Sequence, residues 1–169
     1  MKKNIVKYFI LLSLSFSFFV NCSTNTVQNK DQSENDDIKV TDDNFANVIS
    51  IQVNGSENSY FFSVKIESPD KGCKQYANWW EVISESGELI YRRILGHSHV
   101  NEQPFIRSGG KINISKNQIV IIRGHMNNTC YGTKAMKGSV SSGFVETTLD
   151  TNFAIELEQK EPLPGNCAF

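Results

Sequence analysis

The sequence predicts an all-β fold in the form of one small β-sandwich that occupies residues 45–169. Three observations lead to this prediction. Apolar and polar side chains alternate with a period of two, which sends neighbouring side chains to opposite faces of a sheet. No stretch of this region shows a sustained 3.6-residue apolar repeat, and Gly, Pro or Asn separates the apolar stretches. About seven short strands in a region of this length fit a sandwich or a barrel.

The region before the sandwich divides into two segments of different composition. Residues 1–21 have three lysines ahead of an apolar run of about 13 residues, the pattern of a secretory signal peptide. A helix needs roughly 20 residues to cross a bilayer core, so a permanent transmembrane helix is not expected. Residues 22–44 are rich in Ser, Thr, Asn, Gln and Asp, which predicts a disordered tether because too little apolar surface is available for burial.

The junction of these segments, Phe19-Val20-Asn21-Cys22, resembles the lipobox of bacterial lipoproteins. The resemblance implies that fatty acids such as palmitate are attached through Cys22 and that cleavage falls before it. Phe19 and Asn21 depart from the usual Leu and small residue, so ordinary secretion stays open as the alternative. Two or three acyl chains hold a protein on a membrane far more firmly than one. We therefore expect a lipid-anchored cell-membrane protein, at the outer membrane if the cell is Gram-negative, since Ser23 is not an Asp-type retention signal.

The charge balance argues against one class of partner. The whole chain has a net charge of −1, and without the three leader lysines 14 basic residues face 18 acidic ones. A mildly acidic protein without a basic stripe lacks the electrostatic footprint of nucleic-acid binding. No nucleic-acid partner is expected.

The alternation predicts strands in the following order. They cover residues 49–53, 60–66, 79–84, 88–95, 118–124, 138–144 and 152–158. The link at residues 54–58 contains Asn-Gly and predicts a hairpin between the first two strands. A turn with Ser86-Gly87 is expected to join the third and fourth.

Trp79 and Trp80 begin the third strand and resemble the core tryptophan of immunoglobulin-like domains, so an immunoglobulin-like sandwich is the expected type. Their rings point to opposite faces, so one is expected in the core and the other partly exposed. The outer ring is either a packed surface aromatic or a platform for a ligand.

Three cysteines remain once Cys22 is assigned to lipid, and an exported protein is expected to oxidise them. One disulfide and one free thiol is the simplest count. We favour Cys73–Cys167, because closing so long a loop gains the most and little else holds the C-terminal tail. Cys73–Cys130 is the alternative.

The histidines are the best candidates for chemistry. His97 and His99 are two residues apart on an extended stretch and share one face, and His125 ends another predicted strand. Three imidazoles, with Glu102 nearby, could bind Zn²⁺ or Cu²⁺. The alternatives are that His97 and His99 hydrogen-bond loop backbone, or that they contact a ligand without a metal.

A basic, glycine-rich stretch follows at residues 107–111. Its backbone N–H groups could curl around an anion beside Arg107, although a Gly-Gly turn between strands is the simpler expectation. Arg92 and Arg123 are expected on solvated strand faces. The candidate residues for ligand contact are Trp79, Trp80, Glu102 and Arg107.

No nucleophile motif is present, so an enzyme is not expected.

Residues 73–82 and 91–105 resemble a small family of exported bacterial proteins without an assigned activity. The resemblance implies export and a shared β domain. Two functions follow as expectations. The first is a membrane-anchored module that binds an envelope protein or glycan or has a structural role, with no cofactor. The alternative is an envelope protein that binds Zn or Cu through the His-x-His loop.

Overall fold

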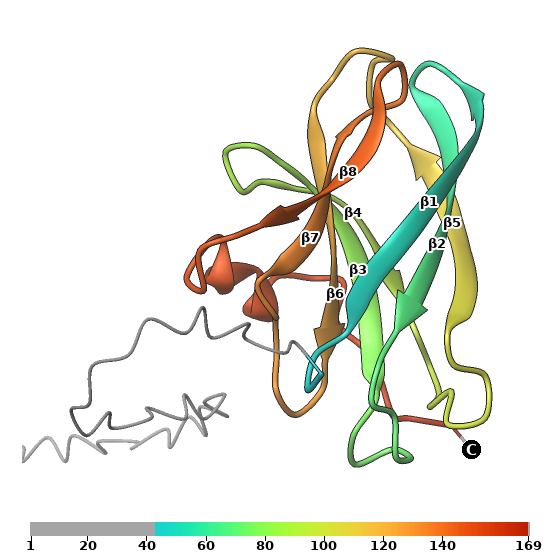
Figure 1. Ribbon diagram of the computed structural model, residues 1–169, viewed down its shortest axis with the longest axis vertical. Coiled ribbons are helices and arrows are strands. Elements are labelled where there is room, and N and C mark those ends of the chain that lie inside the picture. The colour runs from blue at the N-terminus through green and yellow to red at the C-terminus, as the bar shows by residue number, and fades with distance from the viewer. Residues whose placement is uncertain (1–42, 169) are drawn as a thin grey trace, which may run out of the picture.

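The alternating sequence builds two antiparallel sheets in the computed structural model, which describes residues 43–168. The predicted signal peptide, Cys22 and all but the last two residues of the tether lie outside the described residues. The three-stranded sheet contains β1 (Asn47–Ser56), β2 (Ser59–Glu67) and β5 (Phe105–Ile112). The five-stranded sheet contains β3 (Ala77–Ser84), β4 (Leu89–Ile94), β6 (Val120–Met126), β7 (Lys134–Ser139) and β8 (Gly143–Thr148). The two sheets face each other, which confirms the all-β sandwich (Figure 1).

The strand order is the one expected of an immunoglobulin-like sandwich. The first sheet has the order β1-β2-β5, and the second has the order β4-β3-β6-β7-β8. In immunoglobulin nomenclature these are A-B-E and C′-C-F-G, with β4 beside the C strand as in variable domains and β8 added at the edge. Every strand pair is antiparallel.

The core lies between the sheets and takes alternate residues from each strand. β2 contributes Phe62, Val64 and Ile66, all 0% exposed, and Trp80 of β3 is also 0% exposed. Trp80 is therefore the core tryptophan that the sequence predicted. The residues next to Trp80 on β3 point away from the core, so their side chains lie on the outer face of the five-stranded sheet.

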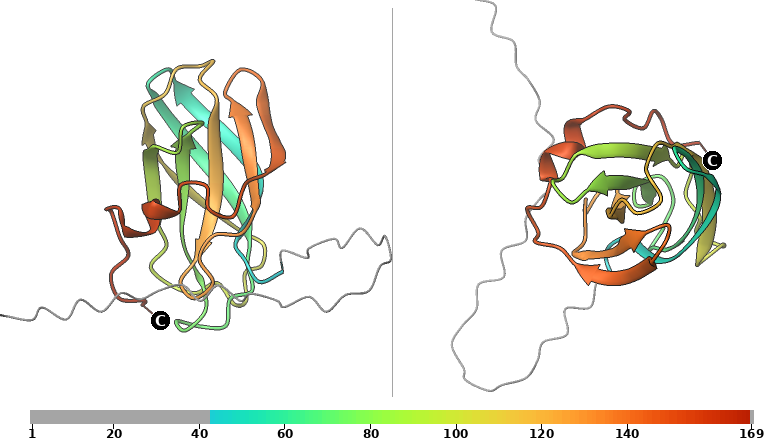
Figure 2. Two further views of the ribbon diagram at one scale, coloured as in Figure 1. Left: turned by 90° about the vertical axis from the view of Figure 1, so that its left-hand side faces the viewer. Right: turned by 90° about the horizontal axis from the view of Figure 1, so that it is seen from above.

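The C-terminal segment covers the outer face of the five-stranded sheet. Residues 149–168 pass across β3 and β6 (Figure 2, left), and Leu157 and Ala154 pack there against Ile83 and Ile121. A strand predicted at residues 152–158 is wrong: the segment forms a turn and a 3₁₀ helix at Ile155–Gln159.

One further predicted strand is wrong, and one strand of the structure was not predicted. Residues 138–144 contain the end of β7, the β7–β8 turn and the start of β8, so the single strand predicted there is wrong. In this turn Ser139 and Ser142 exchange hydrogen bonds. β5 was missed because Gly109 and Gly110 indicated a turn. Instead they lie within the strand, where a Cβ on Gly109 would be 2.5 Å from the Tyr91 hydroxyl.

Candidate functional site

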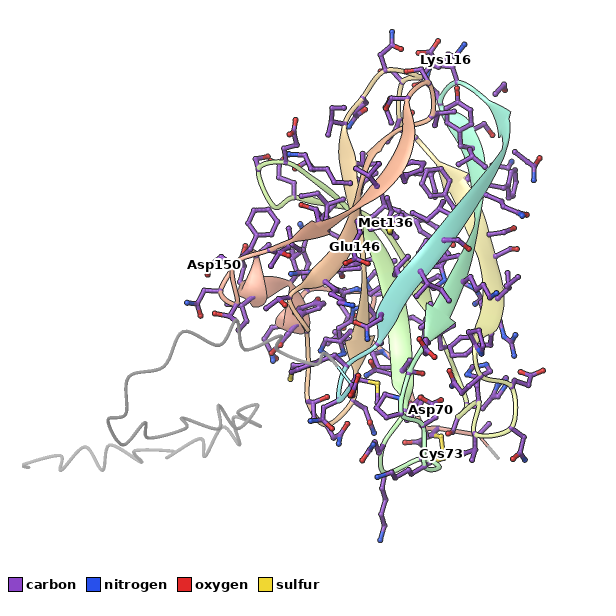
Figure 3. The ribbon with its side chains drawn as sticks, viewed as in Figure 1. Asp70, Cys73, Lys116, Met136, Glu146 and Asp150 are labelled. Carbon is purple, nitrogen blue, oxygen red and sulfur yellow. A yellow bond between two sulfur atoms is a disulfide. The ribbon has the colours of Figure 1, made fainter. Side chains whose placement is uncertain are left out.

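The C-terminal tail is fastened at the lower end of the sandwich by the predicted disulfide. Cys73 and Cys167 are bonded, with their Cα atoms 5.6 Å apart across a sequence separation of 94. Cys73 lies at this end close to Asp70 (Figure 3). Cys130 is also disulfide-bonded, so the expectation of a free thiol is wrong for the described cysteines.

Trp79 does not offer an exposed platform. It is 3% exposed, because the C-terminal segment covers the face onto which it points. The His125 ring from β6 stacks on it with centroids 3.6 Å apart, and the Arg92 guanidinium from β4 lies 4.4 Å from its centroid. The expectation that one of the two tryptophans is partly exposed is therefore wrong.

A buried ion cluster lies beside Trp79 on the same face. Oε2 of Glu81 accepts hydrogen bonds from Nε and Nη2 of Arg92 at 2.9 and 2.6 Å, and Oε1 accepts one from Nε of Arg123 at 2.9 Å. Other guanidinium N–H groups donate to carbonyl oxygens of the C-terminal segment, among them those of Phe153 and Leu157. Arg92 and Arg123 were expected in solvent, and that expectation is wrong.

The sequence contains one signal for this cluster. Glu81 stands between apolar residues of a strand, and a buried carboxylate requires a partner. The strand register pairs Glu81 with both Arg92 and Arg123, but a register is not visible in the sequence before the strands are aligned.

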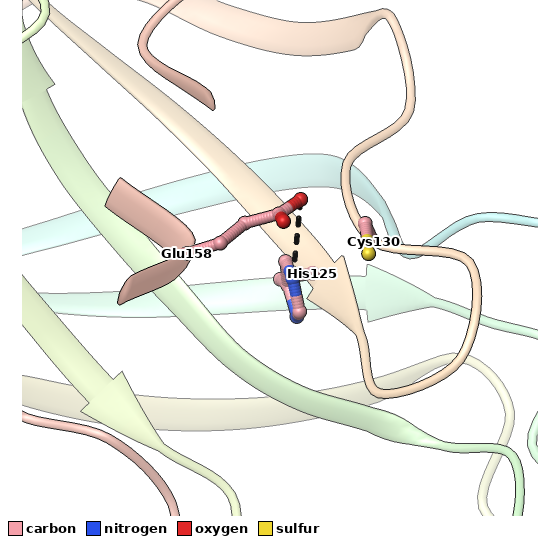
Figure 4. A group of neighbouring side chains, drawn as sticks. All are labelled: His125, Cys130 and Glu158. Carbon is pink, nitrogen blue, oxygen red and sulfur yellow. Dashed lines mark ion pairs between the residues drawn. The ribbon is translucent and has the colours of Figure 1, made fainter. Parts of the chain in front are cut away.

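His125 belongs to this covered face. Its Nδ1 lies 2.7 Å from Oδ1 of Asn78, and its Nε2 lies 3.9 Å from Oε1 of Glu158 (Figure 4). Burial and then Arg92 and Arg123 hold the pKa of His125 well below its usual value. The imidazole is therefore neutral.

The three histidines are not assembled into one site. Among residues 43–168, the set of three His, Cys, Asp or Glu ligand groups within 4.8 Å of one another comprises His125, Cys130 and Glu158, and it contains neither His97 nor His99.

The other predicted site residues do come together. A pocket of about 460 Å³ at the lower end of the sandwich is lined by His97, His99 and Glu102 of the β4–β5 loop and by Arg107 of β5. The rest of the lining comes from Ser98, Val100 and Asn101 of the same loop and from Gly72, Cys73 and Ala168. The disulfide-fastened tail therefore forms part of the pocket wall.

Asp70 holds the pocket loop in place. It is 7% exposed, and its Oδ2 accepts hydrogen bonds from the backbone N–H of His99 at 2.7 Å and from the Ser98 hydroxyl at 3.4 Å. Its Oδ1 accepts from the backbone N–H of Ala77, the first residue of β3, at 2.9 Å. One buried carboxylate thus ties the loop to the sheet.

His99 lies deep in this pocket without a hydrogen bond to its ring. Its side chain is 1% exposed, and neither Nδ1 nor Nε2 has a hydrogen-bond partner. The ring stacks on Phe105 with centroids 3.9 Å apart, and the His97 ring centroid is 4.5 Å away. Burial, followed by the charges of Arg107 and His97, lowers the pKa of His99 to about 4. The ring is therefore neutral at neutral pH.

The outer part of the pocket carries an ion pair. Nη2 of Arg107 lies 2.7 Å from Oε2 of Glu102, and their side chains are 27% and 60% exposed. The hydrogen bond from Arg107 is the main cause that lowers the pKa of Glu102. The pocket thus combines a neutral buried imidazole with a charged pair that a polar ligand can reach.

The comparison with known proteins gives one relative and no matching solved structure. The chain is 33% identical over 99 residues to a protein of Halomicrobium mukohataei named "Putative lipoprotein". The match covers 58% of this chain and 49% of that protein, so the chain spans about half the length of the curated relative. No family model matches the chain. No solved structure matches it either.

Proposed function

We propose that this protein is a membrane-anchored lipoprotein whose sandwich is a binding module of the cell envelope, with its ligand in the pocket lined by His97, His99, Glu102 and Arg107. The observation that carries the binding role is His99. A buried imidazole without any hydrogen-bond partner is unusual in a folded protein, and a ligand is a direct way to satisfy it. It stands at a pocket large enough for a small polar ligand or for one residue of a larger one.

The anchor is supported by the sequence and by the relative. The leader and the lipobox-like residues before Cys22 provide the acceptor site, and the relative of Halomicrobium mukohataei carries the name "Putative lipoprotein". Within residues 43–168 no helix is long and apolar enough to span a bilayer. Lipidation of Cys22 would supply the membrane attachment, at the outer membrane in a Gram-negative cell. Because Cys73 and Cys167 are bonded to each other, acylation of Cys22 and a disulfide at Cys130 exclude each other within one chain.

The composition of the pocket favours an envelope glycan or a polar protein segment as the ligand. Arg107 and Glu102 offer charged hydrogen-bond donors and acceptors, and a neutral His99 can donate through one ring nitrogen and accept through the other. Val100, 51% exposed, adds an apolar contact next to these groups.

Photocrosslinking in intact cells tests the binding role. The photoreactive residue p-benzoylphenylalanine replaces Val100 in the full-length chain, and Val145 of β8, which is 69% exposed and lies outside the pocket lining, is the matched control. We expect a discrete envelope adduct from position 100 that decreases when Arg107→Ala is added, and no such adduct from position 145. Identical adducts from both positions, or one that Arg107→Ala leaves unchanged, would overturn the assignment of the pocket.

A further inference from the structure

His99 has the surroundings of a metal-binding histidine. A metal-ligating imidazole uses one ring nitrogen for the metal and usually directs the other N–H toward a carboxylate. Nδ1 of His99 lies 3.8 Å from Oδ2 of Asp70, which is too far for a hydrogen bond but places the carboxylate on the Nδ1 side of the ring. This arrangement favours a proton on Nδ1 and leaves Nε2 with a free lone pair.

A second imidazole lies within reach of the first. The ring centroids of His97 and His99 are 4.5 Å apart with an interplanar angle of 40°, and both residues line the same pocket. His97 is exposed, so its ring can adjust to a bound ion at little cost. His99, by contrast, is fixed by its contact with Phe105 and by the hydrogen bond of its backbone N–H to Asp70.

The charges around the two rings also suit a cation. Asp70 and Glu102 bring two carboxylates close to the rings, and Arg107 is the opposing cation, already paired with Glu102. The pocket volume of about 460 Å³ leaves room for an ion with water molecules in its remaining positions.

We propose that His97 and His99 form a two-imidazole site for a divalent transition-metal ion, with Cu²⁺ bound more tightly than Zn²⁺. This inference rests on the proposed function, because it places the ion inside the proposed ligand pocket and makes it part of what the module binds. Imidazole ligands suit copper and zinc, and for equal ligands Cu²⁺ is the tighter binder of the two. His125 has no role in the site.

The buried cluster of His125 and Glu158 is the rival location. Nε2 of His125 and Oε1 of Glu158 also lack hydrogen-bond partners, and they lie 3.9 Å apart. A single buried water between the two atoms would satisfy both of them. His125 is 5% exposed and lies on the face that the C-terminal segment covers, whereas His97 and His99 line an open pocket.

Titration of the metal-free, full-length protein in detergent with CuCl₂, and separately with ZnCl₂, tests the inference by calorimetry. We expect one Cu²⁺ per chain, a Zn²⁺ affinity at least tenfold lower, and a loss of at least tenfold in Cu²⁺ affinity for His97→Ala and for His99→Gln. Glu158→Gln is the matched control at the rival location and should leave the affinity unchanged. The exposed position of His97 keeps the test valid if His99→Gln fails to fold.

The outcomes separate this inference from the proposed function. Copper hyperfine coupling to two nitrogen ligands in the electron paramagnetic resonance spectrum, lost in His97→Ala, supports the site. Absence of binding, or binding that Glu158→Gln abolishes and His97→Ala does not, overturns it. If copper fails to bind while the Val100 adduct persists, the inference fails alone. If the adduct is absent while copper binds through His97, the envelope-binding function fails alone.

Discussion

Nη2 of Arg92 lies 2.6 Å from Oε2 of Glu81, and both side chains are 0% exposed. Since Arg123 binds the other oxygen of the same carboxylate, Glu81 is the shared counter-ion of two buried cations. These three residues fasten the C-terminal segment to the sheet, because the guanidinium groups also donate to its carbonyl oxygens.

Glu81→Gln should therefore be strongly destabilising. Removing one member of a buried ion cluster typically costs about 3–5 kcal/mol, because the remaining charges lose their compensation. The free energy of unfolding in urea measures this cost. The control is Glu85→Gln, since Glu85 pairs with Lys137 at 2.7 Å in solvent. An exposed pair contributes about 0–1 kcal/mol. Equal losses in the two variants would contradict the structural role of Glu81.

The double variant Cys73→Ser, Cys167→Ser tests the tail. These cysteines are 94 residues apart, and a disulfide closing a loop of about this length typically contributes about 2–5 kcal/mol. We expect the free energy of unfolding to decrease by an amount in this range in the absence of reductant. A decrease below about 1 kcal/mol would mean that the ion cluster holds the tail without the disulfide.

Stability should fall in mild acid, and His99 is one of the causes. Its pKa is about 4 in the folded protein against an ordinary 6.5, so the unfolded chain binds a proton more readily between these values. The contribution is fully present above pH 6.5 and is lost as the pH falls toward 4. The charged groups around the ring are Arg107 and His97, which lower this pKa, and Asp70 and Glu102, which raise it.

Urea unfolding of the metal-free protein at several pH values between 7 and 4 measures the effect. The variant His99→Gln should lose less stability than the wild type across this range. His97→Gln should stay close to the wild type, because burial and not the His97 charge is the largest cause of the lowered pKa of His99. His125, whose pKa is also lowered, should keep part of the slope in His99→Gln, but a slope equal to that of the wild type would show that His99 does not contribute.

The sequence reveals the local features of this protein more readily than the distant ones. Alternation located β1 and β2, and the β4–β5 loop brings His97, His99 and Glu102 together because they are close neighbours in the chain. The burial of Trp79 escaped prediction, since it depends on a tail more than 70 residues further along. The same applies to His125, which the strand register places opposite Trp79 and away from the pocket.

The amino-acid composition of single strands explains the other incorrect predictions. Gly109 and Gly110 fit a turn by propensity but allow Tyr91 to approach β5, with the Gly110 N–H donating to its hydroxyl at 3.0 Å. Arginine ordinarily prefers solvent, but the buried Glu81 on the neighbouring strand overrides that preference for Arg123.

The mass of the N-terminal peptide of the mature protein tests the central claim most directly. Full-length protein is expressed in bacterial cells, the membrane fraction is digested without reduction, and the peptide that begins at Cys22 is analysed beside a Cys22→Ser control. The account predicts a peptide that carries a diacylglycerol on the Cys22 sulfur, and recovery of the protein from membranes that is lost in the control. A peptide without lipid, or one in which Cys22 is joined to Cys130, would contradict the anchor, because a thioether sulfur cannot also form a disulfide.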